Sequence, residues 1–600
     1  MTFLPTTAAE LKTLGWQQAD IILVSGDTYI DSPFIGVALI GRVLTEAGFK
    51  VAIIAQPDTG SAEDISRLGE PRLFWGVSGG SIDSMVANYT AAYKHRKSDD
   101  FTPGGQNTRR PDRAVIAYTN LIRRFCKGGK PIVLGGIEAS LRRLAHFDAW
   151  SNRVRKSILF DAKADILVYG MAEKTVLALA ECLDQGRDFR DLPGLCYPAS
   201  TPPTHALILP DFSTVAAESK ALIAMFHTFY QNNDPITAQC LAQRQDDNRF
   251  LIQNPPAPLL SQDELDRIHE LPFTRSVHPY YQNQGKVKAQ DTIQFALTTH
   301  RGCYGECNFC AIAVHQGRTV VNRSLESILR EARQLGKHPD FKGIILDAGG
   351  PTANMYGYEC PKKIAKGVCR HRRCLTPEIC PSLKIDHRPQ ITLLRRLRAL
   401  PGVKQVFVAS GIRYDLILAD NTNGLKYLKA LVDHHISGQM KVAPEHSQDH
   451  VLNLMGKPDI ASLLEFKRLF ERYSRDAGKE QYLTYYYIAA HPGCRSEDMT
   501  SLRDFCRQAL RTTPEQVQIF TPTPSTYSTL MYCTGCNPFD NAEIFVERDK
   551  ARREAQKRQL TGARKPPQHH SAPRRQHRID TGASLAVPAH PGAGRHRKKR

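Results

Sequence analysis

The feature that most constrains the fold is a pattern repeated through the first 170 residues. Short apolar runs at residues 21–25, 51–55, 73–77, 132–134 and 166–169 are followed by small-residue turns or by segments with helical spacing. Strands that alternate with helices are typical of a doubly wound parallel sheet, in which ligands bind at the carboxyl ends of the strands. Four of these runs end at a turn that contains glycine. A tight turn alone explains any one of these glycines equally well, but four at corresponding positions indicate a ligand site. We therefore predict an N-terminal α/β domain over residues 1–258, in which 201–258 serve partly as an irregular, proline-containing connection.

A second series of alternating elements begins near residue 291. Strands are predicted at 292–298, 343–347, 405–409, 440–443, 482–488 and 516–520, with helices at 325–336, 392–400, 425–435 and 460–476. Six strands with crossovers predict a partial (β/α)6 barrel of the TIM type over residues 289–560. In such a fold the chemistry lies at the C-terminal ends of the strands.

Composition excludes several classes of protein. Of the 600 residues, 41% are hydrophobic and 23% are charged, which is typical of a chain with folded cores. No apolar run reaches the roughly 18 residues of a membrane-spanning helix, and the N-terminus lacks the apolar stretch of a secretory signal. We therefore expect no membrane association and a cytoplasmic location. In that reducing compartment the clusters among the 15 cysteines are more typical of metal ligands than of disulfides.

The formal charge of +20 is concentrated at the C-terminus. Residues 548–600 contain 16 Lys and Arg against three Asp and Glu, so this segment alone carries a net charge of +13. It begins as a short charged helix and continues without apolar periodicity, which predicts a disordered basic tail over residues 561–600. Any binding of nucleic acid is expected through this tail, since its Lys and Arg would neutralise phosphates.

The strongest chemical signal is the segment from His300 to Cys310, which places Cys303, Cys307 and Cys310 in C-x3-C-x2-C spacing after a predicted strand. Thiolates on one loop favour an iron–sulfur cluster or zinc. Three ligands on a 4Fe–4S cluster leave one iron open to bind a substrate, whereas structural zinc takes four ligands. A zinc site completed by a cysteine from elsewhere remains the alternative.

This loop, with Phe309 before the third cysteine, resembles the fingerprint of the radical S-adenosylmethionine (SAM) superfamily. Later segments are similar to the strand-end motifs of the same superfamily: Leu346–Asn354 with its Gly-Gly turn, Ser410–Asp415, Val442–His446 and His491–Gly493. Together with the long N-terminal α/β region, these motifs resemble the poorly characterised YgiQ family, over residues 15–558. The tail differs from what that family is expected to carry there.

The resemblance implies that Cys303, Cys307 and Cys310 hold one 4Fe–4S cluster. It also implies that SAM is bound by Gly349, Gly350, Ser410, Arg413 and Glu445, where Arg413 would clamp a carboxylate or form a structural ion pair. A reduced cluster would then cleave SAM to methionine and a 5′-deoxyadenosyl radical that abstracts hydrogen from a substrate. The electron would come from a reductant protein such as a flavodoxin or ferredoxin. The substrate and the catalytic residues are not predicted.

Two further cysteine groups are present. Cys360, Cys369, Cys374 and Cys380 lie in a Lys/Arg-rich insertion, in a spacing that fits no standard zinc ribbon. They predict either a second metal or cluster site or scattered thiols, with equal weight. Cys533 and Cys536 form a C-x2-C pair that we interpret as incidental.

The first domain resembles the cobalamin-binding domains attached to some radical SAM enzymes. Its turns at Gly135–Ser140 and Asp165–Glu173 are similar to those that line such a site, but Gly26–Ser32 lacks the histidine that would ligate cobalt. A substrate domain, or a fold that has lost its cofactor, is therefore favoured over cobalamin.

Three functions follow from these motifs. The first is a radical SAM enzyme with an unknown substrate. The alternatives are a cobalamin-dependent radical SAM methyltransferase and a non-catalytic, metal-stabilised nucleic-acid-binding protein. The last is disfavoured because no aromatic platform for single strands stands out. Analysis for iron and sulfide, zinc or a corrinoid would distinguish the three.

Overall fold

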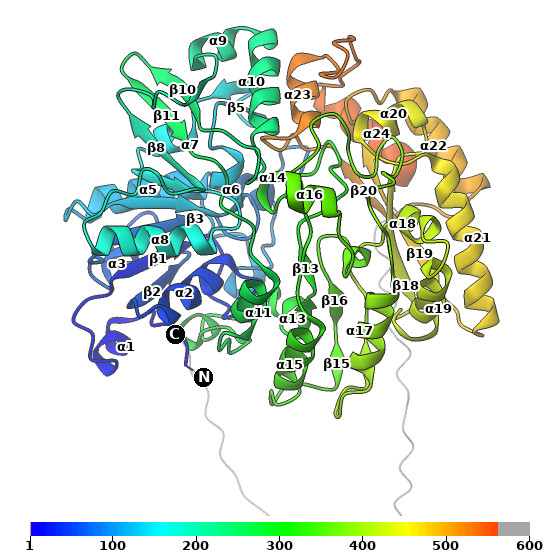
Figure 1. The fold of residues 1–600 in the computed structure, drawn as a ribbon, viewed down its shortest axis with the longest axis horizontal. Helices are drawn as coiled ribbons and strands as arrows, with labels where there is room; N and C mark the ends of the chain where they lie inside the picture. The colour runs from blue at the N-terminus through cyan, green and yellow to red at the C-terminus, as the bar shows by residue number, and fades with distance from the viewer. Residues whose placement is uncertain (1, 562–600) are drawn as a thin grey trace, which may run out of the picture. The chain divides into compact units, whose positions relative to one another are not determined.

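A nine-stranded mixed sheet organises the first half of the chain (Figure 1). The computed structural model describes residues 2–561, so the predicted tail lies outside the described residues from 562 onward. The sheet order is β2-β1-β3-β4-β7-β8-β11-β10-β9, and the first five of these strands are parallel. The strands are β1 (Ile21–Ser25), β2 (Val51–Ala55), β3 (Phe74–Ser78), β4 (Ile132–Gly135), β7 (Ile166–Val168), β8 (Leu195–Ala199), β9 (Leu207–Ile208), β10 (Leu241–Asp246) and β11 (Arg249–Gln253).

Alternate side chains of the parallel strands pack into two hydrophobic cores, one on each face of the sheet. Ile22 and Val24 of β1 pack in the core that contains Tyr118 of α5, whereas Ile21 and Leu23 pack in the core formed with α2 and α8. All four β1 side chains are almost fully buried. Strands covered on both faces are expected to be apolar throughout, which explains why they read as continuous apolar runs.

The first-half helices are α1 (Ala8–Thr13), α2 (Gly36–Glu46), α3 (Glu63–Ser66), α4 (Ser84–Asn88), α5 (Ala114–Phe125), α6 (Gly136–Leu141), α7 (Ile158–Asp161), α8 (Glu173–Asp184), α9 (Phe212–Ala217), α10 (Ser219–Gln231), α11 (Gln262–Glu270), α12 (Pro279–Gln282) and α13 (Gln290–Ile293). A separate hairpin joins β5 (His146–Asp148) and β6 (Arg153–Arg155). None of the helices within residues 2–561 combines the length and apolar character of a membrane span.

The predicted parallel sheet is present in its first five strands, but the prediction of an irregular connection within residues 201–258 is wrong. That segment contains β9, β10 and β11, which extend the sheet, and β11 pairs antiparallel with both β8 and β10. Prolines around Thr201–Pro258 lower the strand signal, because a proline cannot donate a ladder hydrogen bond. The hairpin of β10 and β11 also has no helix between its strands, and a strand–helix–strand alternation was the signal on which the prediction depended.

The second half contains shorter sheets that are connected in chain order. Parallel pairs join β12 (Ala296–Thr298) to β16 (Asp347–Gly349), β15 (Ile344–Ile345) to β17 (Gln405–Val406), and β18 (Gln439–Glu445) to β19 (Tyr482–Ala489) and β20 (Gln516–Ile519). A parallel bridge between Ile412 and Val442 links the segment after β17 to β18. The predicted strands are thus present, although most are shorter than expected.

The second-half helices are α14 (Ile312–His315), α15 (Leu325–Leu335), α16 (Pro361–Lys366), α17 (Arg388–Arg398), α18 (Tyr414–Ala419), α19 (Gly424–His434), α20 (Asp449–Met455), α21 (Ile460–Asp476), α22 (Ser496–Gln508), α23 (Tyr527–Thr534) and α24 (Lys550–Thr561). A two-residue antiparallel pair joins β13 (His300–Arg301) to β14 (Val321–Asn322). Backbone contacts group the described residues into a single unit, and the predicted domain boundaries at 258 and 289 stay a prediction.

The order of the parallel strands locates a candidate ligand-binding position in the large sheet. The chain passes from β1 outward to β2 and then returns to β3 on the other side of β1. The connections therefore diverge between β1 and β3, which is the topological switch point at which open α/β sheets bind ligands.

Candidate functional site

The three cysteines predicted to hold a cluster lie on the loop between β13 and α14, and each is a half-buried free thiol. A methyl group built on Gly305 would lie 3.2 Å from the Cys303 Sγ and 3.6 Å from the Cys307 Sγ, so these two thiols face a common point. The Cys310 amide donates to the Cys307 carbonyl at 3.0 Å, which turns the chain between them.

Asn308 fixes this loop to two distant segments. Its amide donates to the Met455 carbonyl at 2.8 Å, and its side-chain nitrogen donates to the Leu454 carbonyl at 2.9 Å. Its own carbonyl accepts from the Ser528 amide at 2.9 Å. The end of α20 and the start of α23 therefore hold the segment between Cys307 and Cys310.

Arg413 lies beside the loop and is buried. Its Nε and Nη2 donate to the two carboxylate oxygens of Asp415 at 2.8 and 2.5 Å, and its Nη1 lies 3.7 Å from the Cys307 Sγ. The bidentate pair fixes the plane of the guanidinium. Its remaining Nη1 thus faces the cysteine loop, and the predicted contact with a SAM carboxylate stays a prediction.

Burial affects the acidity of the thiols on this loop. Burial, followed by the neighbouring Cys307 thiol, raises the pKa of Cys310 to about 12. Burial also raises the pKa of Cys303, although the Gly305 amide donates to its sulfur at 3.3 Å. Because the thiolate is the ligand, iron would displace these protons. A soft, all-sulfur donor set with N–H groups aimed at it fits an iron–sulfur cluster.

The Gly349–Gly350 turn packs against protein side chains. A Cβ on Gly350 would lie 2.6 Å from the His300 imidazole, and one on Gly349 would lie 2.9 Å from the Ser410 Oγ. Two residues further on, the Thr352 hydroxyl lies 3.6 Å from the Cys303 Sγ. Glycine is therefore required here by the close approach of His300 and Ser410.

Asp347 connects the ends of two neighbouring strands. Its Oδ1 accepts from the Ala409 and Ser410 amides at 2.8 and 3.1 Å, and its Oδ2 accepts from the Ser410 hydroxyl. The predicted SAM residues Gly349 and Ser410 are thereby held side by side.

Glu445 and His446 are both buried, but they differ in backbone conformation and in their partners. Glu445 has a positive φ of 70° and is 8% exposed, and burial raises the pKa of its carboxyl group against the opposing effect of Lys457, whose Nζ lies 3.8 Å away. His446 is held by the Gln448 amide at 3.1 Å and contacts the Cys494 Sγ at 3.5 Å. Burial lowers the pKa of His446 to about 4, so it is a neutral packing group.

The second cysteine set is divided by depth. Cys360 and Cys374 are buried in a small apolar cluster with Tyr304, whereas Cys369 and Cys380 are half-buried. Within residues 2–561 no three His, Cys, Asp or Glu side chains gather closely enough to hold a single metal ion. This finding covers both cysteine sets, but a cluster spreads its thiolates over several irons and does not need such a cage. A metal on Cys360, Cys369, Cys374 and Cys380 stays a prediction.

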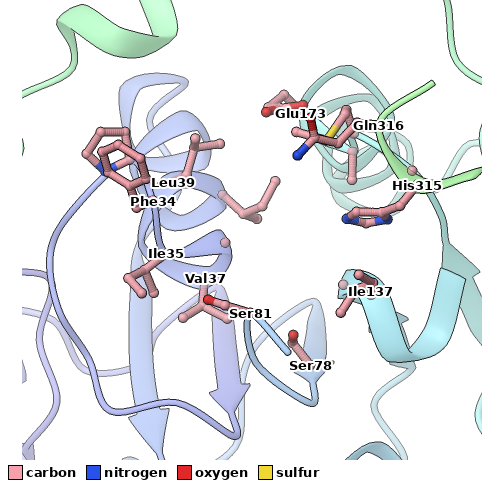
Figure 2. A pocket seen from close by; sticks show the side chains of 18 of the residues that line it. Phe34, Ile35, Val37, Leu39, Ser78, Ser81, Ile137, Glu173, His315 and Gln316 are labelled. Carbon is pink, nitrogen blue, oxygen red and sulfur yellow. The ribbon is translucent and has the colours of Figure 1, made fainter. Parts of the chain in front are cut away.

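A cavity of about 520 Å³ lies between the large sheet and the SAM motifs. It is bounded by the turns after β1, β3, β4 and β7 on one side and by Gly349, Gly350 and Ser410 on the other. Figure 2 shows the apolar side chains of Phe34, Ile35, Val37 and Leu39 opposite Glu173, His315 and Gln316. We call this space the central cavity. The switch point of the sheet therefore opens onto the predicted SAM residues.

Sequence reasoning gave no role to several polar groups of this cavity. Glu173 is 3% exposed and pairs with Arg301 at 2.5 Å, while its second oxygen has no hydrogen-bond partner in the described structure. The buried His300 Nε2 and the His315 Nδ1 are also without partners there. Burial lowers the pKa of both imidazoles to about 4, so they are neutral. The only signal in the sequence was their position next to the quoted motifs.

Comparison with known proteins now assigns the family. The family described as Radical SAM N-terminal matches residues 3–296. A UPF0313 protein of Fusobacterium nucleatum is 55% identical over 566 residues, which cover 94% of this chain and all of that protein. The chain belongs to the UPF0313 family. Other UPF0313 members include one from Thermotoga maritima, 50% identical over 91% of this chain and 96% of its own, and one from Clostridium perfringens, 46% identical over 92% and 84%.

This UPF0313 chain is therefore a radical SAM enzyme, a class that needs an electron donor, and the names of its relatives state no reaction. Two solved structures are similar to it at low identity. They are the methyltransferase TsrM from Kitasatospora setae, with a TM-score of 0.46 and 15% identity over 84% of this chain and 72% of its own, and the cobalamin-dependent enzyme OxsB, with a TM-score of 0.47 and 13% identity over 86% and 55%.

Proposed function

We propose that this chain binds a 4Fe–4S cluster through Cys303, Cys307 and Cys310, binds SAM beside it, and cleaves SAM reductively to act on a substrate in the central cavity. The proposed SAM-binding residues are Gly349, Gly350, Ser410, Arg413 and Glu445. The proposal includes a partial barrel formed by β12, β15–β16, β17, β18, β19 and β20, since neighbouring strands in this series are parallel.

The observation that carries the proposal is the meeting of the cysteine loop with two separate motifs. Thr352 contacts Cys303, and Arg413 contacts Cys307, although they lie on different strand-end segments. Gly349 and Ser410 of the same two segments line the central cavity. A ligand bound at these strand ends would thus have the cluster on one side and a substrate on the other.

When bound, the cluster and SAM would supply one-electron cleavage of the sulfonium. The residues of the chain hold and shield this chemistry. Arg413, fixed by Asp415, presents Nη1 to the Cys307 Sγ and would place a positive charge beside a bound cluster. Phe34, Ile35 and Leu39 form an apolar wall of the cavity and would reduce the water around a bound substrate.

The two walls of the central cavity indicate how a substrate would be oriented. The apolar side chains around α2 would receive a hydrocarbon or aromatic portion, and the unpaired Glu173 oxygen would accept a hydrogen bond from a donor group. The neutral His300 and His315 offer further hydrogen bonds.

The test is anaerobic reconstitution of the full chain. We expect about four irons and four sulfides per chain, with broad absorbance at about 400 nm. With reductant and SAM, the protein should release 5′-deoxyadenosine, and the triple Cys→Ala variant at 303, 307 and 310 should release none. A fully loaded, reduced protein that forms no 5′-deoxyadenosine would refute the proposal.

Cobalamin is the second candidate ligand of the central cavity. The cavity opens at the switch point of the parallel sheet, where open α/β folds take cofactors. The turn after β1, Gly26–Ser32, contains no histidine to ligate cobalt. A corrinoid absorbance spectrum after reconstitution with hydroxocobalamin would support this candidate, and its absence would leave the cavity to the substrate.

A further inference from the structure

A second cavity, of about 1020 Å³, adjoins the cysteine loop at Glu306 and Asn308. We call it the cationic recess, because basic side chains outnumber acidic ones in its lining. Its Arg and Lys residues are Arg318, Arg370, Arg372, Arg373 and Lys457, and its Asp and Glu residues are Glu306 and Glu378. The insertion that carries most of them, residues 360–386, contains seven Lys and Arg against two Asp and Glu.

The Glu306 charge is already compensated inside the protein. Its carboxylate accepts from Lys363 at 3.4 Å and from the Tyr230 hydroxyl at 3.3 Å, and Arg318 lies 3.8 Å away. Lys363 and Arg318 are almost completely buried. Glu306 therefore cannot offset the positive charge at the mouth of the recess.

Two cations at the mouth are exposed and have no ion-pair partner in the described residues, and the exposed Glu378 lies in the same lining. Arg370 and Arg372 are exposed, and neither forms an ion pair within residues 2–561. Phe539, 52% exposed, lies at the same mouth. Surfaces rich in arginine and aromatic side chains are typical of protein–protein contacts.

The recess is connected directly to the cysteine loop. Arg373 donates to the Glu306 carbonyl at 3.2 Å, and its guanidinium lies over the rings of Tyr527 and Phe539 at 5.2 and 5.1 Å. Glu306 and Asn308 are the residues on either side of Cys307. A molecule held at the mouth is thus separated from Cys307 by the loop itself.

We propose that the cationic recess is the docking surface for an acidic electron-carrier protein of the flavodoxin type. This inference rests on the proposed function, because a cluster on the cysteine loop would receive the electron. The reduced flavin of the carrier loses one electron and the cluster gains it, and no bond forms or breaks. The exposed cations attract the acidic surface of the carrier and orient its flavin edge towards the loop.

The experiment compares two reductants on the full, reconstituted chain. Cluster reduction is followed by the loss of absorbance after mixing with reduced flavodoxin or with dithionite, at low and high salt. The test variant is R370E/R372E, and the matched control is R395E/R398E on the exposed face of α17. All three proteins keep the same C-terminal tail, so its charge contributes equally.

We expect the flavodoxin rate constant of R370E/R372E to fall by at least about 10-fold and to lose its dependence on salt. The dithionite rate should stay within about threefold of the wild-type rate, and the control should resemble the wild type with both reductants. An unchanged flavodoxin rate, or an equal loss in the control, would overturn the inference. Binding of pyrophosphate that the variant loses, with the flavodoxin rate unchanged, would instead identify a small-anion site.

The two proposals can fail separately. If flavodoxin reduces the cluster in a recess-dependent way but no 5′-deoxyadenosine forms, the docking inference stands and the proposed SAM cleavage fails. If dithionite drives SAM cleavage while R370E/R372E accepts electrons from flavodoxin at the wild-type rate, the SAM proposal stands and docking fails.

Discussion

The two cavities beside the cysteine segment are opposite in character. In the central cavity Glu173 and Arg301 form a buried ion pair, and one wall is apolar. In the cationic recess Arg370 and Arg372 are exposed and without carboxylate partners in the described structure. Buried pairs resist change because breaking them leaves an isolated charge, whereas exposed charges act through long-range attraction. The cysteine loop thus lies between a cavity suited to binding a substrate and a surface suited to binding a partner protein.

The largest effect is expected from removing a thiol of the cysteine loop, in comparison with a thiol of the insertion beside the recess. Cys303→Ala should lower 5′-deoxyadenosine formation more than about 100-fold, since even outer partners of metal ligands cost 10- to 100-fold. Cys374→Ala, in the insertion beside the recess, should keep the wild-type product yield within about threefold. Iron analysis and product chromatography test both variants. An eight-iron wild type that loses half its iron in Cys374→Ala would instead establish a second cluster.

Glu173→Gln should destabilise the protein by about 3–5 kcal/mol, because it leaves the Arg301 charge buried and unpaired. The matched control is Glu326→Gln, which breaks an exposed pair with Arg396 and should cost less than about 1 kcal/mol. Urea denaturation gives the free energy of unfolding of each. Equal losses in the two variants would mean that the central cavity does not isolate its charges from water.

Gly350→Ala should cost about 1–3 kcal/mol, since its methyl group would overlap the buried His300 ring at 2.6 Å. Gly411→Ala provides the control, because a methyl group there meets no atom within 4 Å. Thermal denaturation measures both. A Gly350→Ala protein as stable as Gly411→Ala would show that His300 can move away freely.

His300 should make stability depend on pH. Burial lowers the pKa of His300 to about 4 in the folded state, whereas the unfolded value is 6.5. Between these values the unfolded chain binds a proton that the folded chain does not, so stability falls as the pH drops below 6.5. From pH 7.5 to pH 5 this group should cost about 2 kcal/mol. The wild type should therefore lose that much more than His300→Asn in urea titrations at the two pH values, and parallel losses would contradict the assignment.

The smallest effect is expected at the recess. R370E/R372E should change the free energy of unfolding by no more than about 0.5 kcal/mol, because exposed, unpaired side chains contribute little. A loss above about 2 kcal/mol by urea denaturation would show that these arginines are structural, and would remove the contrast between the two cavities.

The sequence predicted most of the parallel elements closely. The strand Ile21–Ser25 and the helix Ile460–Asp476 have the predicted bounds, because continuous apolar runs and helical spacing are local signals. The antiparallel extension by β9–β11 was missed, since pairing between distant strands leaves little local trace. The spacing of Cys303, Cys307 and Cys310 predicted that the three lie on one loop after a strand, and they do.

The polar contacts of the site could not be predicted in the same way. The pair of Glu173 with Arg301 joins residues 128 positions apart, and the contact between Glu306 and Tyr230 joins residues 76 apart. Arg413 was predicted from its motif, but its engagement with Asp415 and its approach to Cys307 depend on how the strand ends are arranged. Such pairs are set by tertiary packing, so a single sequence does not specify them.

The anchoring of Asn308 has a consequence for how the protein is made. Its partner Ser528 leaves the ribosome 220 residues later, which at 5–20 residues per second is roughly 10–45 s. Throughout that interval the nascent chain carries three thiols on a segment that lacks at least one of its two anchors. A translation product that stops short of α23 would therefore present those thiols to oxidants on an incompletely anchored loop.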